Sequence, residues 1–317
     1  MKKAIIFGGA GFIGSALVKC LVEKGTDIIV IEKPGIQREE RYKRISDIPH
    51  VLVECDLLSE ESRRQLLQCE LLENADVFYQ FAWDGLDRDS LVDYQKQMSN
   101  VTAILDTIEI AVKLHCKRFI GAGSFTEREL YTVEGRSYQK DRHKYYRAAQ
   151  LFCETMGKSV ASELQIEFFW PQIINVYGPG EESERLIYML LKSLYRKEPI
   201  PLSAGEQFYD FLYITDAARA FELIGEKGTY GNEYMIGSGN PKLLKDFFVE
   251  IQKVIAPEQP LRLGELLYTG IMHRYEDLAN TKLDELGFAP EIDFLDGIKR
   301  TYNFMLTKMK EKENNAK

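Results

Sequence analysis

The chain has 317 residues, of which 45% are hydrophobic and 28% charged, and its 49 acidic and 41 basic side chains give a formal net charge of −8. This length exceeds the roughly 250 to 300 residues at which one hydrophobic core stops growing, so we expect two domains or one domain with an appendage. The acidic balance disfavours a general nucleic-acid binder, whose affinity depends on clustered Lys and Arg.

Short runs rich in β-branched residues alternate with longer helical stretches up to Trp170. The expected strands are Lys3–Phe7, Asp27–Glu32, Val51–Cys55, Val77–Ala82, Arg118–Ala122 and Gln165–Phe169. The clearest helix spans residues 91–112, where apolar residues recur at spacings of three and four. This alternation predicts βαβ units and therefore an α/β fold of the Rossmann type, with a doubly wound parallel sheet that binds ligands beyond the carboxyl ends of its strands.

Beyond Pro171 the pattern changes, because glycine and proline separate shorter elements. Amphipathic helices are expected at Asp246–Ile255 and Leu295–Met305. This pattern of short elements is typical of a smaller, loop-rich C-terminal domain that closes over a substrate.

A glycine loop follows the first strand and opens the first helix. Gly8, Gly11 and Gly14 permit the unusual φ of the turn, the close approach of the backbone to a pyrophosphate, and tight packing of helix on strand. The amides at the helix start, including those of Phe12 and Ile13, then point at the anion and the helix dipole adds to the attraction. This position, at the first strand of a βαβ chain, predicts a dinucleotide site.

The second expected strand ends in an acid. Glu32 lies 18 residues after Gly14, where a carboxylate accepts hydrogen bonds from an adenosine ribose. A carboxylate there repels a 2′-phosphate, so NAD is the expected cofactor and NADP is less favoured. Lys33, Arg38 and Arg41 follow closely and weaken this preference.

The five cysteines are scattered and form no C-x-x-C pair. Neither a disulfide framework nor a metal site is therefore predicted, and a cytoplasmic location is expected. Lys2 and Lys3 before an apolar stretch imitate a secretory signal, but glycines interrupt the stretch and no A-x-A site follows. No apolar run approaches the roughly 20 residues of a membrane helix, so we expect neither membrane nor nucleic acid as a partner.

Several short motifs are specific in their order and spacing. They are the glycine loop, Cys55-Asp56-Leu57, Asn100-Val101-Thr102, Arg118-Phe119-Ile120 leading to Ser124, Asn175-Val176-Tyr177-Gly178-Pro179-Gly180, residues 209–216, Ile236-Gly237-Ser238-Gly239 and residues 286–290. With them the chain resembles, nearly end to end, an extended short-chain dehydrogenase/reductase of the NAD-dependent epimerase/dehydratase type, a family that acts on nucleotide-diphosphate sugars.

The resemblance implies a domain division, a substrate and an assembly. Residues 1–172 and 209–232 would form the Rossmann NAD-binding domain, and residues 173–208 and 233–317 a smaller, discontinuous substrate domain. A nucleotide-diphosphate sugar would be the substrate, and the protein would be a homodimer. The cofactor-binding positions that the resemblance adds are Asp56, Leu57, Phe81, Ala82, Asn100, Tyr146 and Gln150, and the substrate-binding positions are Ser124, Asn175, Tyr209 and Arg274.

The family passes a hydride between a sugar carbon and the nicotinamide, while a tyrosine moves the hydroxyl proton. Carried over, the tyrosine is Tyr146, its hydroxyl partner is Ser124, and Gln150 occupies the position of the catalytic lysine. A free tyrosine with a pKa near 10 is only about 0.1% ionised at pH 7, and a neighbouring cation lowers such a pKa by about 1 to 3 units. Loss of the lysine therefore costs about 10-fold to 1000-fold in phenolate, unless another positive group replaces it. The nicotinium ring of NAD⁺ is one such source, and Arg142 and His143 are the substitutes nearest in the sequence.

Two further departures concern the substrate. The dehydratases of the family carry Asp-Glu directly after the Ser or Thr, and here these positions are Phe125 and Thr126, so dehydration is disfavoured. An arginine that clamps the diphosphate in the family is replaced by Tyr209, which leaves Arg274 and Asn175 as phosphate ligands.

Three functions follow as hypotheses. The first is an NAD-dependent nucleotide-sugar epimerase that transiently oxidises a sugar hydroxyl. The second is an NAD(P)H-dependent reductase of a 4-keto nucleotide sugar. The third is a catalytically weakened protein that binds NAD and a nucleotide sugar.

Overall fold

The computed structural model describes residues 1–132, 143–181, 185–199, 201–268 and 270–315. The chain divides into two compact units. Unit 1 comprises Met1–Ile173 and Ala218–Met235, and unit 2 comprises Ile174–Ala217 and Ile236–Lys317.

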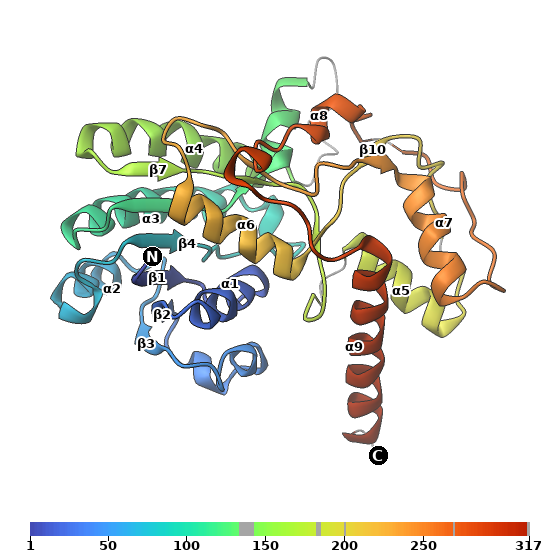
Figure 1. Cartoon of the computed structure of the whole chain (residues 1–317), viewed down its shortest axis with the longest axis horizontal. Helices are drawn as coiled ribbons and strands as arrows, with labels where there is room; N and C mark the ends of the chain where they lie inside the picture. Colours follow the sequence, from blue (N-terminus) through green and yellow to red (C-terminus); the bar gives the residue numbers. More distant parts are fainter. Residues whose placement is uncertain (133–142, 182–184, 200, 269, 316–317) are drawn as a thin grey trace. The chain divides into compact units, whose positions relative to one another are not determined.

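Unit 1 is built on a six-stranded sheet with the order β3-β2-β1-β4-β5-β7 (Figure 1). Every neighbouring pair is parallel. The strands are β1 (Lys3–Phe7), β2 (Asp27–Glu32), β3 (Val51–Glu54), β4 (Val77–Gln80), β5 (Arg118–Gly121) and β7 (Glu167–Phe169). This is the strand order of the doubly wound dinucleotide-binding fold, so the predicted α/β fold is confirmed. The order reverses between β1 and β4, and such a switch point is where ligands bind.

The predicted strands all form, with small differences at their ends. β1 and β2 have the predicted bounds, whereas β3, β4 and β5 end one or two residues earlier. β7 begins at Glu167 and not at Gln165, because Gln165 is the left-handed residue (φ 59°) that ends the preceding helix. A second, small sheet joins β6 (Gly123–Ser124), β8 (Gln172–Ile173) and β12 (Met235–Ile236).

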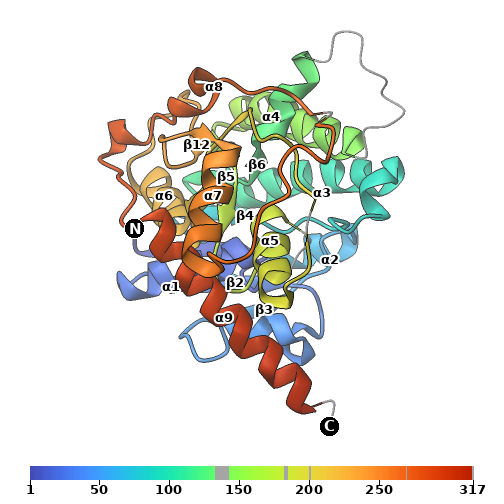
Figure 2. The ribbon, with the colours of Figure 1, turned by 90° about the vertical axis from the view of Figure 1, so that its right-hand side faces the viewer.

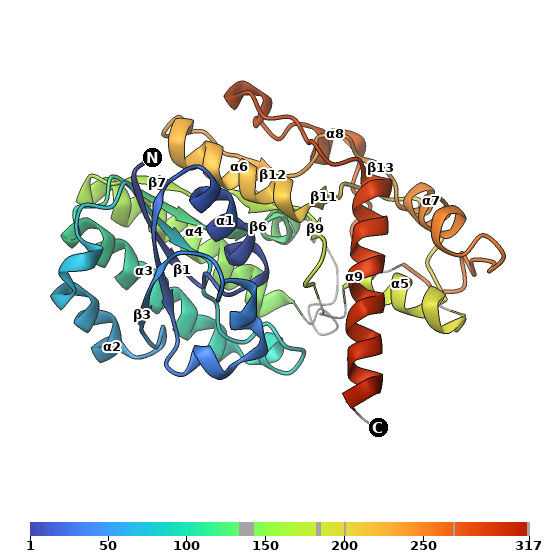
Figure 3. The same ribbon diagram turned by 60° about the horizontal axis from the view of Figure 1, so that its bottom comes forward.

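Helices cover both faces of the large sheet. They are α1 (Phe12–Glu23), α2 (Glu60–Gln65), α3 (Tyr94–Lys113), α4 (Lys144–Leu164) and α6 (Ile214–Lys227), whose first four residues belong to unit 2. Figure 3 shows α1 and α6 on one side of the sheet and α2 and α3 on the other. With both faces covered, β1 is buried from Ala4 to Phe7, as parallel strands generally are.

The helix predicted over residues 91–112 begins later than its apolar pattern. The Asp93 side chain accepts hydrogen bonds from the backbone of Gln95 and Lys96 and so caps α3 at Tyr94. Ser90–Val92 form a 3-10 turn instead.

Unit 2 contains two strand pairs and a group of helices. β9 (Val176–Tyr177) pairs with β11 (Leu212–Tyr213), and β10 (Phe208–Tyr209) pairs with β13 (Lys242–Leu243). The helices are α5 (Leu186–Arg196), α7 (Leu244–Ile255), α8 (Tyr275–Ala279) and α9 (Phe294–Asn315). Figure 2 shows α5, α7 and α9 side by side. The two predicted amphipathic helices are confirmed as α7 and α9, and α9 extends ten residues further than expected.

None of the helices in the described ranges is long and apolar enough to cross a membrane.

Candidate active site

The glycine loop between β1 and α1 requires glycine for steric reasons. Gly8 has φ +89°, and a Cβ there would lie 2.7 Å from the backbone nitrogen of Ala82. A Cβ on Gly14 would overlap the carbonyl oxygen of Gly8. That oxygen accepts the Gly11 N–H at 3.1 Å, which folds the loop back on itself. The loop therefore brings β1, β4 and the start of α1 into close contact.

The N-terminus of α1 presents free amide groups. Its N-cap is Gly11, no described side chain caps it, and its first turn contains no acid. The amides of Phe12, Ile13 and Gly14 thus have no intrahelical acceptor. A helix start of this kind attracts an anion such as a pyrophosphate.

Glu32, at the end of β2, is buried beside this loop. Its Oε1 accepts the Ala10 N–H at 2.7 Å, and its Oε2 lies 3.3 Å from the guanidinium of Arg41. Burial raises the pKa of Glu32, and the Ala10 N–H and Arg41 oppose that rise. Arg44 donates to the Ala10 carbonyl at 3.2 Å, so one arginine contacts the carboxylate and a second contacts the backbone of the residue that the carboxylate binds.

The turn after β3 is held by local hydrogen bonds. Asp56 is exposed, and its Oδ1 accepts the Leu58 N–H at 3.0 Å. Leu57 is buried, and its carbonyl oxygen accepts from the guanidinium of Arg63. An apolar side chain and a carboxylate thus lie together at the edge of the sheet.

The loop after β4 is held at two points. The amides of Phe81 and Ala82 both donate to the Phe7 carbonyl, at 2.8 and 2.9 Å. Asn100 is fully buried in α3, where its Oδ1 accepts from Asp84 N and its Nδ2 donates to Asp84 O, both at 2.8 Å. Asn100 therefore shapes the loop that Phe81 and Ala82 begin.

Ser124 and Tyr146 lie on two elements that pack together, β6 and α4. The Ser124 Oγ is 2.8 Å from the Thr126 Oγ1, and Ser124 is half-buried. Tyr146 is also half-buried, and the ring of Trp83 meets it edge-on with centroids 5.5 Å apart. Trp83 is itself held by a 3.0 Å hydrogen bond from its Nε1 to Gln97. The structure thus brings the serine and the tyrosine to one part of unit 1.

Gln150 lies one turn beyond Tyr146 on α4 and is 2% exposed. Its Oε1 accepts no hydrogen bond from any donor in the described part of the chain. Of the two cations considered as substitutes for the lysine, Arg142 lies outside the described residues, and His143 is exposed just before α4. Arg147 pairs with Glu129 at 2.7 Å.

The sequence did not draw attention to Glu127, which the structure places directly behind Ser124. Glu127 is fully buried, and its Oε1 accepts the Ser124 N–H and, at 3.2 Å, the Trp170 Nε1–H. Burial, reinforced by Glu154, raises the pKa of Glu127 to about 8. The available signal was its spacing, since position i+3 returns to the same side in a 3-10 turn.

Ser124, one of the four predicted substrate residues, belongs to unit 1, and the other three belong to unit 2. Asn175 donates to the Asp210 carbonyl at 3.3 Å, and Tyr209 precedes Asp210 in the chain. Arg274 is exposed at the start of α8, which packs against β10, and its guanidinium lies 3.3 Å from Asp277. The ring of Tyr209 lies 5.7 Å, centroid to centroid, from that of Phe211, so each of these side chains has a structural partner within its own unit.

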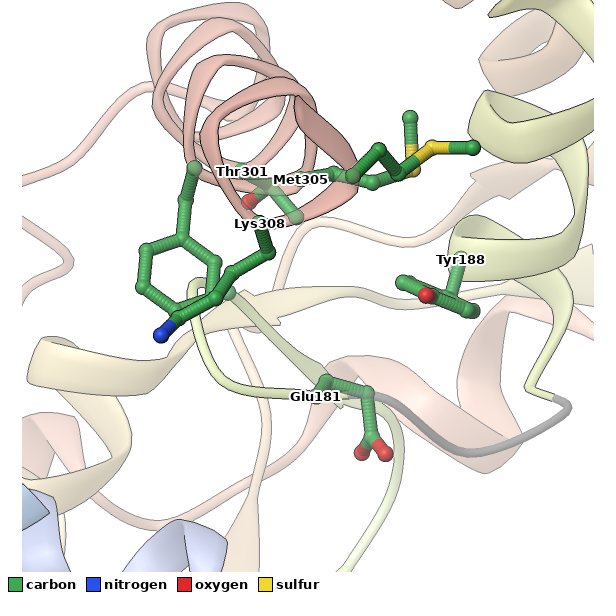
Figure 4. Close-up of a pocket in the computed structure, with 8 residues that line it drawn as sticks. Glu181, Tyr188, Thr301, Met305 and Lys308 are labelled. Carbon is green, nitrogen blue, oxygen red and sulfur yellow. The ribbon is translucent and has the colours of Figure 1, made fainter. Parts of the chain in front are cut away.

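Figure 4 shows a pocket in unit 2 between α5 and α9, with Tyr188 on one side and Met305 on the other. Its lining also includes Glu181, Thr301 and Lys308, and it contains none of the predicted site residues. A second pocket is lined by Ser238, Gly239, Ala279, Asn280, Thr281, Asp284, Phe288 and Pro290. Within the described residues, no group of three His, Cys, Asp or Glu side chains is arranged to hold a metal ion.

Comparison with known proteins gives a consistent result. A model of the NAD dependent epimerase/dehydratase family matches residues 4–237. The CDP-abequose synthase of Salmonella typhimurium is 23% identical over 303 residues, which cover 93% of this chain and 95% of that protein. The dTDP-glucose 4,6-dehydratase of the same organism is 27% identical, with 96% and 92% covered.

Solved structures show the same fold. The UDP-N-acetylglucosamine 4-epimerase of Methanobrevibacter ruminantium M1, in complex with UDP-N-acetylmuramic acid, superposes with a TM-score of 0.78 at 19% identity, covering 97% of this chain and 99% of the other. The Bordetella bronchiseptica enzyme WbmF in complex with NAD⁺ gives a TM-score of 0.75 at 21% identity, with 99% and 95% covered.

Proposed function

The chain belongs to the NAD dependent epimerase/dehydratase family, and from that premise we propose that it is an NAD-dependent epimerase of nucleotide-diphosphate sugars. The observation that carries the proposal is the placement of Ser124 on β6 against α4, the helix that contains Tyr146. Both elements belong to the unit whose first strand opens into the glycine loop. The residues proposed to bind the cofactor and those proposed to move the proton thus belong to one unit.

The residues of unit 1 fit NAD. The uncapped start of α1 suits the pyrophosphate, and Glu32 suits the adenosine ribose. Asp56 and Leu57 would border the adenine, while Phe81 and Ala82 would line the path towards Tyr146. When bound, NAD supplies a hydride acceptor.

The reaction needs a group that moves one proton. Tyr146 takes the proton from a sugar hydroxyl, and Ser124 holds that oxygen by a hydrogen bond. The same tyrosine would return the proton to that oxygen when the keto group is reduced again by the cofactor. Thr126, 2.8 Å from the Ser124 hydroxyl, orients it.

The site does not favour elimination of water. Phe125 and Thr126 replace the acid pair that would protonate a leaving hydroxyl. Glu127, the next acid, is fully buried and directed at Trp170, away from solvent. Its carboxyl is thus not available to a substrate.

A reductase of 4-keto nucleotide sugars is the second candidate, and Gln150 favours it. Oxidation of a hydroxyl requires Tyr146 as phenolate, which is scarce without a neighbouring cation. Reduction of a ketone requires the neutral phenol as acid, which prevails at pH 7. The missing lysine therefore impairs oxidation of a hydroxyl more than reduction of a ketone.

Unit 2 would bind the sugar nucleotide, with Asn175, Tyr209 and Arg274 at its diphosphate. We further propose a homodimer formed through α3 and α4, because exposed apolar side chains gather on these two helices. They are Tyr94, Met98, Phe152 and Met156. Sedimentation analysis tests the dimer, and a charged residue at Met98 should dissociate it. A cytoplasmic location stays a prediction.

One assay separates the candidate functions. The purified protein is incubated with NAD(H) or NADP(H) and panels of nucleotide sugars and 4-keto sugars, and absorbance and product identity are followed. Isomerised sugar without net cofactor consumption supports the epimerase, whereas stoichiometric oxidation of NADH supports the reductase. Cofactor binding without turnover of any sugar would contradict both and favour a weakened binding protein.

A further inference from the structure

Glu127 lies in the 3-10 segment Phe125–Thr132 and connects two elements behind the site. Its Oε1 accepts the Ser124 N–H from β6 and the Trp170 Nε1–H from the end of β7. The carboxyl is fully buried. One oxygen of this acid therefore holds the backbone of Ser124 in place.

The other oxygen of Glu127, Oε2, receives no hydrogen bond from any donor in the described ranges. Glu154, on the helix α4 that packs against this segment, interacts with Glu127. Two ionised carboxylates in contact inside a protein repel each other and lack solvation. A proton between them satisfies the unpaired oxygen and removes the repulsion.

The surrounding charges determine how many protons the pair keeps. Lys158, one turn along α4, lies 2.8 Å from Glu154 Oε1 and 3.0 Å from Glu233. Cys153 also borders Glu127, and its pKa is raised, mainly by burial and further by Glu127. In the described part of the chain, Lys158 forms an ion pair with Glu154 and no basic side chain forms one with Glu127, so the charge of Glu127 is uncompensated there unless this carboxyl is protonated.

We propose that Glu127 keeps one buried proton at neutral pH, which it shares with Glu154 in a hydrogen bond, and that Glu127 in this state is a positioning residue for Ser124. Loss of the proton to water breaks the carboxyl O–H bond and leaves two adjacent negative charges. The repulsion is relieved only by movement of Glu127, which carries the Ser124 backbone with it. The raised pKa of Glu127, about 8, agrees with a proton held at neutral pH.

Ionisation of the carboxyl pair also affects the proposed base, because Glu154 and Tyr146 lie on the same helix, α4. Tyr146, Gln150 and Glu154 follow at intervals of four and share one face of the helix. A second negative charge at the carboxyl pair would lie near the helix face that Gln150 shares with Glu154, and the neutral amide of Gln150 supplies no compensating charge. Ionisation of the pair therefore disfavours the phenolate of Tyr146 as well as displacing Ser124.

Tryptophan fluorescence tests the shared proton without any assay of activity. The chain contains Trp83 and Trp170, so Trp83→Phe leaves Trp170, which donates to Glu127, as the single reporter. Between pH 6 and 9.5 we expect one transition near pH 8. Glu127→Gln should abolish it, because the amide oxygen still accepts both N–H groups and the amide nitrogen donates to Glu154.

Two further variants complete the test. Glu154→Gln removes the neighbouring charge and should move the transition to lower pH, a result that does not depend on the folding of the Glu127 variant. Glu233→Gln, an exposed acid that also contacts Lys158, is the matched control and should keep the transition. No transition in this pH range, or one that persists in Glu127→Gln, would overturn the shared proton.

The positioning role rests on the proposed function, whereas the shared proton does not. In the parent enzyme, turnover should fall about tenfold per pH unit above the fluorescence transition, and in Glu127→Gln this decline should be absent. A fluorescence transition with an unchanged alkaline limb in Glu127→Gln would refute the positioning role alone. Absence of turnover with every sugar would instead count against the proposed function.

Discussion

Gln150 lies one helical turn from Tyr146, buried in α4, with its side-chain oxygen unpaired among the described residues. A neutral amide at this position can form a hydrogen bond with a ribose hydroxyl, but it supplies no charge. The relationship makes position 150 the most direct place to test how the tyrosine is activated.

Gln150→Lys should lower the pKa of Tyr146 by about 1 to 3 units, because an ammonium group would stand one turn from the phenol. The pH–rate profile of sugar oxidation should shift downward accordingly, and turnover at pH 7 should rise about tenfold or more. Gln150→Met, similar in length but uncharged, is the control and should give no shift. An unchanged profile in the lysine variant would mean that another cation already serves Tyr146.

Tyr146→Phe should lower turnover by about 100-fold to 10,000-fold, the usual contribution of a general acid or base. The ring that packs against Trp83 is kept, so the thermal midpoint and NAD affinity should stay close to those of the parent protein. Tyr145→Phe, the neighbouring tyrosine, is the matched control. Substantial residual turnover in Tyr146→Phe would exclude it as the base.

Gly14→Ala should destabilise the protein by about 1 to 3 kcal/mol and weaken NAD binding, because the new methyl group overlaps the Gly8 carbonyl oxygen. In an ordinary helix the same change stabilises by about 1 kcal/mol, so the sign is diagnostic. Urea unfolding and NAD titration measure both effects. Lys19→Ala, exposed on the same helix, should alter neither.

Glu32→Gln should narrow the preference for NAD over NADP by about tenfold or more, since the charge that repels a 2′-phosphate is removed. The glutamine still accepts the Ala10 N–H, so the loop should keep its shape. Arg41, 3.3 Å from Glu32, then remains as a cation for the phosphate. Dissociation constants for both cofactors check this, and adding Arg41→Gln should reverse the gain for NADP.

Glu127 should make the folded protein less stable as pH rises. Its carboxyl keeps a proton in the folded state up to about pH 8, whereas the unfolded chain releases it near the ordinary value of 4.5. The unfolded state therefore binds fewer protons between these limits, and stability falls with a slope of up to about 1.4 kcal/mol per pH unit. Urea unfolding at pH 5.5, 6.5 and 7.5 should show that the free energy of unfolding of Glu127→Gln rises relative to that of the parent protein over this pH range. If the free energies of unfolding of the two proteins differed by the same amount at every pH, Glu127 would be ionised in the folded protein.

Much of the fold follows from local sequence. The alternation of β-branched runs and helical stretches predicted the six strands of the parallel sheet, because strand and helix impose different periods on buried residues. The glycine loop was recognisable for a similar reason, since Gly8 and Gly14 occupy positions where a Cβ cannot fit. Element ends were less accurate, as at α3, where the Asp93 cap prevails over the apolar pattern.

The environment of each site residue was decided only by tertiary structure. Glu127 and Glu154, Trp83 and Tyr146, and Glu32 and Arg41 come together because separate elements pack, and no spacing in the chain encodes these contacts. The sequence by itself determined which groups are present, including an amide at position 150 and an acid at position 127. Burial and the charges brought beside them determine whether such groups are ionised, because the free energy of a charge depends on its surroundings and not on its place in the chain.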